Sequence, residues 1–214
     1  MKRFFLAGAS VLFATAFIVG HSQALEVMHP TGVYVQKPTG MAYPESVGNF
    51  RRVSIIRYEP DDSDESAGYN RYVPLKEIVA TVYVFPSPTL RSFGSPRSVI
   101  EDARNHLCTD QFGAIKKEVT GAHPDAVLLR ESAADLVQGN VKHAGHFAAY
   151  RLTNRKFAGR ENVLLRSDVH VFCYAGGKWT VEYRIDYPFD YDASAEIAAF
   201  MQGLIWTIPP EPGN

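Results

Sequence analysis

The chain has 214 residues, with 22 Lys and Arg against 23 Asp and Glu, and a formal net charge of −1 at pH 7. This near-neutral balance argues against a nucleic-acid-binding protein, which should carry a basic face. Because 46% of the residues are hydrophobic and 12% are aromatic, the chain can bury a core, and its length is that of one domain.

Residues 1–24 have the three-part pattern of a secretory signal. Two basic residues precede an uncharged apolar run (residues 4–20), and small residues in Ser22–Ala24 supply a cleavage site. The alternative is an uncleaved anchor helix, because the run is near the lower limit of ~17 residues for spanning a bilayer. Residue 25 is Leu25 rather than Cys, which excludes the lipid-attached form of the signal. We therefore expect a soluble periplasmic or secreted protein, with no membrane span after cleavage.

The mature chain opens irregularly. Residues 25–49 are rich in Pro, Gly and Tyr and lack a clear period, which predicts a lead-in to a single α+β domain over residues 50–214. In residues 51–60, Val53, Ile55 and Arg57 alternate with Ser54, Ile56 and Tyr58, and this pattern predicts a strand. Residues 60–70 read as a polar loop. Residues 77–86 are rich in β-branched and aromatic side chains and predict a second, buried strand, paired antiparallel with the first.

A helix and four strands follow. Ser95 is the expected N-cap and Pro96 the first helical position, and Gly121 and Pro124 end the helix. The next four apolar segments predict a meander of strands over residues 126–138, 146–154, 162–174 and 178–188.

A second helix closes the chain. It is opened by Asp192 and ended by Pro209 and Pro210, and its apolar residues, at helical spacing, are Ile197, Phe200, Met201, Leu204 and Ile208. The element order ββαββββα contains no βαβ alternation. It predicts an α+β fold, a mostly antiparallel sheet of about six strands packed by two main helices.

The element order, the hairpin "GGKWTVEYRIDYP" and the closing helix "EIAAFMQGLIW" resemble the α/β sandwich of the PsbP, Mog1 and DcrB-type proteins. The stretches "YPESVGNFRR", "GYN" and "ATVYVFP" are similar to uncharacterised secreted bacterial proteins. The resemblance implies a fold and a cell-envelope address. Members of that fold bind proteins or have no known role, so the resemblance implies no catalytic residue.

Two sequence features could suggest a metal. His143 and His146 resemble half a zinc site, but the other ligand pair is missing, and on a strand the two side chains point to opposite faces. The acidic run over residues 61–65 lacks the spacing and the closing Glu of a calcium-binding EF-hand loop. We interpret the first as a surface pair and the second as a solvated turn, and expect no metal and no cofactor.

Catalytic motifs are also missing from the sequence. It has no Gly-x-Ser-x-Gly elbow and no phosphate-binding Gly-x-x-x-x-Gly-Lys-Ser/Thr loop. Glu182 and Arg184 alternate with apolar residues, so we interpret them as a charge pair on the less apolar face of their strand. The sequence predicts no catalytic residue.

A contact surface for a protein partner is the remaining hypothesis. Tyr and Arg, the residue types enriched at binding hot spots, gather early in the mature chain. The candidate contact residues are Tyr58, Tyr69, Tyr72, Arg51, Arg52 and Arg71. The alternative is that these tyrosines cap the ends of the sheet with their hydroxyls in water. The sequence thus favours an envelope protein with a binding or structural-support role, and the second hypothesis is a hydrolase or metal-dependent enzyme with a dispersed site.

Cys108 and Cys173 are the two cysteines of the chain, and both follow the signal peptide. An oxidising compartment favours a disulfide between them. A two-residue turn at Gly176 and Gly177 would place Tyr174 opposite Trp179, Phe172 opposite Val181 and Cys173 opposite Thr180. A helix packed on that face of the hairpin would bring Cys108 to Cys173. The alternative is two buried free thiols that act as small hydrophobic residues.

Overall fold

The computed structural model describes residues 25–91 and 94–210, so the predicted signal peptide lies outside the described residues. The elements in chain order are β1 (Glu26–Met28), β2 (Tyr34–Val35), β3 (Ala42–Tyr43), β4 (Ser46–Val47), β5 (Phe50–Arg57), β6 (Glu65–Arg71), β7 (Ile78–Pro86), α1 (Arg97–Ala122), β8 (Val127–Gln138), β9 (Val141–Phe157), β10 (Arg160–Ala175), β11 (Trp179–Pro188) and α2 (Ser194–Gly203).

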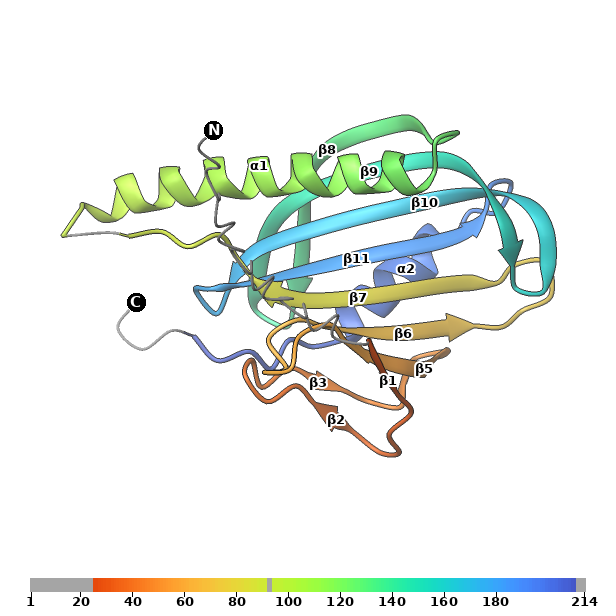
Figure 1. Cartoon of the computed structure of the whole chain (residues 1–214), viewed down its shortest axis with the longest axis horizontal. Helices are drawn as coiled ribbons and strands as arrows, with labels where there is room; N and C mark the ends of the chain where they lie inside the picture. The colour runs from red at the N-terminus through yellow and green to blue at the C-terminus, as the bar shows by residue number, and fades with distance from the viewer. Residues whose placement is uncertain (1–24, 92–93, 211–214) are drawn as a thin grey trace, which may run out of the picture.

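Nine strands form one sheet in which every pair is antiparallel (Figure 1). The strand order is β1-β5-β6-β7-β11-β10-β9-β8, and β4 also pairs with β5. Strands β2 and β3 form a separate pair. The α+β class with an antiparallel sheet and two helices is confirmed, but the expected count of about six strands is wrong.

Strand β6 accounts for part of the difference. Its sequence is polar and contains Gly68, which reads as a loop, yet it lies between β5 and β7. A Cβ atom on Gly68 would lie 3.0 Å from Ser54 Oγ and 3.2 Å from Val53 Cγ2, so glycine permits the close approach of β5. The charged Glu65 is fully buried in this strand because Arg57 on β5 pairs with it.

The two helices lie on opposite faces of the sheet (Figure 1). On β11 the side chains of Val181, Tyr183 and Ile185 point to the α2 face and belong to the main core. The other face packs against α1 through a smaller cluster that includes Phe112 and Val171. Each fully buried Val, Ile or Phe side chain contributes about 1.5–3 kcal/mol, so this two-sided burial holds the sheet between its helices.

The segment over residues 25–49 packs against the sheet through buried side chains. Met41 and Tyr43 are fully buried in the main core. The side-chain amide of Gln36 donates to the carbonyl oxygens of Asp62 (2.9 Å) and Val84 (3.3 Å). This segment, expected as an irregular lead-in, therefore contains short strands and contributes to the main core.

Both helix boundaries differ from the expected ones by a few residues. Pro96 occupies the N-cap of α1 and the helix begins at Arg97, one residue later than expected. Asp192 Oδ1 accepts hydrogen bonds from the backbone N–H (3.1 Å) and hydroxyl (2.7 Å) of Ser194 just before α2. The helix ends at Gly203, so Ile208 lies beyond it. Within residues 25–91 and 94–210, neither helix has the length and apolar character needed to cross a bilayer.

Candidate functional site

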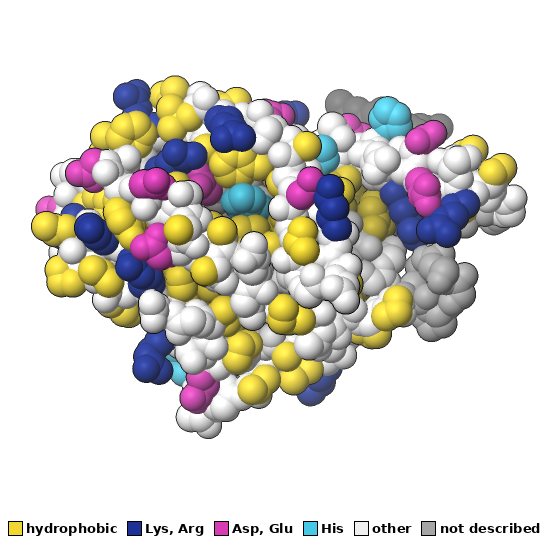
Figure 2. Space-filling model, turned by 180° about the vertical axis from the view of Figure 1, so that it is seen from behind, with side chains coloured by type: hydrophobic (Ala, Val, Ile, Leu, Met, Phe, Trp, Pro, Cys, Tyr) yellow, Lys and Arg dark blue, Asp and Glu magenta, His cyan; other side chains and the backbone are white. Residues whose placement is uncertain are grey.

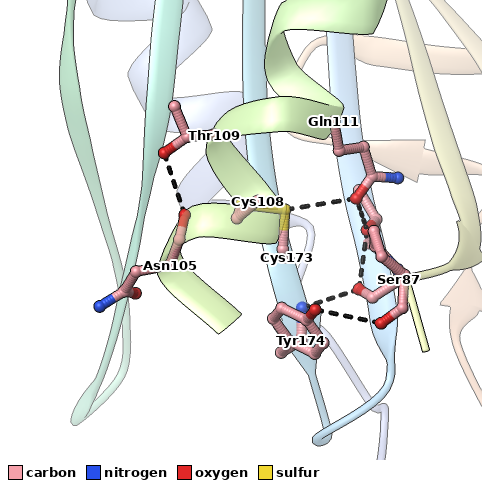
Figure 3. Close-up of a disulfide and its surroundings, with 9 residues drawn as sticks. Ser87, Asn105, Cys108, Thr109, Gln111, Cys173 and Tyr174 are labelled. Atoms are coloured by element: carbon pink, nitrogen blue, oxygen red, sulfur yellow. Dashed lines mark hydrogen bonds between the residues drawn. A yellow bond between two sulfur atoms is a disulfide. The ribbon is translucent and has the colours of Figure 1, made fainter. Parts of the chain in front are cut away.

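Cys108 on α1 and Cys173 on β10 form a disulfide, with an S–S distance of 2.04 Å and a Cα–Cα distance of 5.7 Å (Figure 3). The register of the hairpin differs from the expected one at this point. Phe172 pairs with Val181 as expected, but Ala175 rather than Tyr174 pairs with Trp179. A bulge therefore lies next to the disulfide on β10.

Hydrogen bonds fix this bulge from both sides (Figure 3). Tyr174 has a positive φ of 58°, and its backbone N–H donates to Ser87 Oγ (2.9 Å). Its hydroxyl donates to the carbonyl oxygen of Pro88 (3.0 Å). Gln111 Oε1 on α1 accepts from the hydroxyl of Thr180 (3.1 Å). These contacts and the disulfide join α1 to the centre of the sheet, which is a structural role.

The six candidate contact residues do not form one exposed surface. Tyr69 is fully buried, and its hydroxyl donates to the carbonyl oxygen of Pro44 (2.8 Å). Arg52 donates to the carbonyl oxygens of Pro30 (2.6 Å) and Gly32 (2.9 Å) and thereby holds the chain before β2.

The other four differ in exposure and in the partners that they contact. Tyr58 stacks on Tyr83 at 6.2 Å on the α1 face, and Arg71 pairs with Glu196 of α2 at 3.3 Å. Arg51 and Tyr72 are exposed. Buried and exposed side chains are therefore mixed among the six residues, and they do not form a single Tyr/Arg patch.

The two histidines weighed as metal ligands contact different aromatic rings. His143 packs on Trp206 with centroids 4.1 Å apart, and His146 stacks on Phe112 at 5.0 Å. Burial lowers the pKa of both imidazoles. Across the described parts of the chain, no three His, Cys, Asp or Glu side chains are arranged to hold a metal ion.

The charge pair expected on β11 is present. Arg184 Nε bonds to a carboxylate oxygen of Glu182, and its terminal nitrogen lies 2.8 Å from Glu118 on α1. Burial raises the pKa of Glu182, and Arg184 partly opposes that effect. This interaction joins the helix to the sheet.

A cavity of about 420 Å³ lies between β8, β10 and α2 on the other face, and we name it the β8–α2 pocket. In the view from behind, a hollow in the surface is surrounded by basic, acidic and histidine side chains that lie among hydrophobic ones (Figure 2). Its apolar lining includes Leu136, Phe147, Ile197 and Met201, and its polar lining includes Arg130, Ser132, Arg166, Asp168, His170 and Tyr187.

His170 is the central polar group of this pocket. Its ring lies 4.7 Å from the ring of Phe147 and 6.5 Å from that of Phe172. Burial lowers its pKa from the ordinary 6.5 to about 4, so the imidazole is neutral at pH 7. Among the described residues neither ring nitrogen has a hydrogen-bond partner, so the ring can offer one donor and one acceptor.

Asp168 is held by neighbours other than His170. Its carboxylate accepts from the Tyr187 hydroxyl (2.8 Å) and from Arg166 Nε (3.1 Å). Burial raises the pKa of Asp168, and these two donors oppose that effect. The carboxylate therefore serves to fix Arg166 and Tyr187 in the pocket wall, and it does not orient the imidazole as a catalytic base.

The sequence contained a signal for this pocket that motif searching missed. Arg166, Asp168 and His170 occupy every second position of β10, while Val169 and Val171 between and after them are buried on the other face. Polar side chains on the core-facing side of a strand indicate a buried polar site.

A scan against protein-family models and a search of curated proteins both gave no match for the chain.

Proposed function

We propose that this protein is an exported binding protein of the cell envelope and that its ligand enters the β8–α2 pocket. The observation that carries the proposal is the unpartnered, neutral imidazole of His170 in an apolar-lined cavity. Ligand pockets of ~300–1,000 Å³ combine apolar walls with a few convergent polar groups, which is the composition of this pocket.

The lining defines the ligand group that would fit. Leu136, Ile197 and Met201 offer apolar contact, and His170 offers a hydrogen bond. The basic and acidic side chains of the wall are mixed, which favours an uncharged group over a strongly charged one. We therefore propose a compact apolar group that carries a hydrogen-bonding atom.

Other observations support an envelope address. The disulfide suits an oxidising compartment, and the residues that precede the described structure have the pattern of a secretory signal. The resemblance to the PsbP, Mog1 and DcrB-type sandwich is part of the same proposal, since members of that fold bind proteins or have no known role.

Binding of Nile red, an uncharged dye with a carbonyl acceptor, tests the pocket. Ala198 is an exposed residue of α2 that lines the pocket, whereas its exposed neighbour Ala199 does not. Ala198→Trp should fill the pocket and weaken dye binding at least tenfold, and Ala199→Trp should leave it within twofold.

A variant of the polar anchor completes the test. His170→Phe keeps an aromatic ring between Phe147 and Phe172 but removes the hydrogen bond, and it should weaken dye binding about fivefold. Equal dye affinities for both Trp variants would place the dye elsewhere and contradict the proposed function.

A further inference from the structure

Strand β8 is a long, open edge of the sheet. It has 12 residues and, among the described strands, pairs only with β9. Apart from an irregularity between Leu128 and Arg130, its register with β9 is regular to Gln138. The strand contains no proline, and Val127, Leu128, Leu129 and Val137 are exposed. An edge of this kind presents free backbone N–H and C=O groups to any extended chain.

The opposite edge of the sheet is covered. There β1, of three residues, and β4, of two residues, both pair with the outer side of β5. Very short edge strands are a usual protection against added strands. The protection of one edge and the openness of the other suggest that the β8 edge has a use.

The β8–α2 pocket runs along this open edge. Six consecutive residues of β8, Ser132–Val137, line it, together with residues of α2. Consecutive side chains of a strand point to opposite faces. A pocket lined by all six must therefore reach the outer rim of the strand, where the free backbone groups lie.

The hairpin turn fixes which backbone groups are free. Gly139, with φ of 57°, and Asn140 form a two-residue turn closed by the pair Gln138 and Val141. Such a closing pair exchanges both of its hydrogen bonds, and the bonding alternates along an antiparallel ladder. The N–H and C=O groups of Ala133 and Asp135 accordingly point outward.

We infer that β8 receives an extended segment of a partner protein as an added strand, with alternate side chains of that segment entering the β8–α2 pocket. The inference rests on the proposed function, because it names the kind of ligand that the pocket takes. Main-chain hydrogen bonds to an edge strand supply affinity, and a pocket for alternate side chains supplies specificity. The partner segment carries an apolar side chain that reaches His170, and it has no proline at its paired positions.

A second copy of this chain fits the same edge less well. On the pocket face β8 carries Ser132, Ala134 and Leu136; the first two are too small to fill about 420 Å³, and Leu136 is already buried in the core of its own copy. A larger apolar side chain on a foreign segment would fill it.

Selection from a displayed library of random 12-residue peptides tests the inference. We expect enriched peptides with apolar residues at alternate positions, and one of them is then synthesised. Ala133→Pro removes an outward N–H and should weaken this peptide at least tenfold, while an edge strand still accommodates the proline. Ala133→Thr changes the same side chain but keeps the N–H, so it should bind the peptide at least tenfold more tightly than Ala133→Pro does.

The outcomes separate this inference from the proposed function. A library without enriched peptides, or equal peptide affinities for the Pro and Thr variants, would overturn strand addition, while the Nile red result with Ala198→Trp would still decide the pocket. Size-exclusion chromatography adds one more outcome. A dimer that Ala133→Pro converts to a monomer would assign the edge to a second copy and overturn the inference.

Discussion

Acidification should destabilise the protein through His170, and His170→Phe should remove that part of the pH dependence. Burial lowers the pKa of His170 to about 4 in the folded protein, against 6.5 in an exposed chain. The unfolded protein therefore binds a proton at a higher pH than the folded protein does. The stability that depends on the neutral ring is present above pH 6.5 and is lost as the pH falls toward 4.

The magnitude follows from the two pKa values. Between pH 7 and 4.5 they correspond to at most about 2.5 kcal/mol of unfolding free energy. Because the ring lines an open pocket, solvent screening reduces the expected loss to about 1–2 kcal/mol. Urea unfolding at pH 7, 6, 5 and 4.5 measures it as the difference between the unaltered protein and His170→Phe.

The comparison with the variant is needed because other groups titrate in the same range. Burial raises the pKa of Asp168, Glu182 and Asp186, and a raised carboxyl pKa makes the folded protein more stable as the pH falls. These effects cancel in the difference, apart from changes at Asp168, which lines the same pocket as His170. A difference that stays constant from pH 7 to 4.5 would refute the burial of a neutral imidazole in this pocket.

Three further predictions concern the disulfide, a buried charge and export. Replacing Cys108 and Cys173 together with Ser should lower the unfolding free energy by up to about 4 kcal/mol, since the bond closes a loop of 65 residues, and urea unfolding measures this; alkylation of both thiols in the unreduced, unfolded protein would contradict the bond. Arg57→Ala should cost about 3 kcal/mol because it leaves the fully buried Glu65 carboxylate without its cation and with the Tyr34 hydroxyl as its remaining donor, whereas Arg97→Ala, from an exposed ion pair on α1, should cost under about 0.5 kcal/mol. The mature protein should begin at Leu25, which the intact mass of exported material measures, and a product that keeps the first 24 residues would contradict cleavage.

The long apolar strands and both helices could be predicted from the sequence because each carries its own period. Buried and half-buried residues alternate along β7. The helix α1 begins directly after Pro96 and carries Cys108 on the side that packs against the sheet. The pairing of β10 with β11 was also predictable at Phe172 and Val181. Local pattern sufficed wherever a strand or helix buries one continuous face.

The elements that the sequence did not predict depend on distant partners. β6 is a strand because Arg57 neutralises Glu65 and because Gly68 lets β5 approach, and neither effect is visible in the local pattern. The bulge at Tyr174 depends on Ser87, far away in the sequence. The β8–α2 pocket likewise needs β8, β10 and α2 together, so its residues had no shared motif.

The position of β11 sets the order in which the fold can be completed. β11 lies between β7 and β10, which are joined in the chain only through α1, β8 and β9. Until Trp179–Pro188 is available, β7 and β10 each present an unpaired edge, and the main core lacks Tyr183 and all of α2. For a chain synthesised from its N-terminus, the sheet cannot close until nearly the whole chain has been made. The interval before closure is then the period of greatest aggregation risk, and it ends when the last strand and helix arrive.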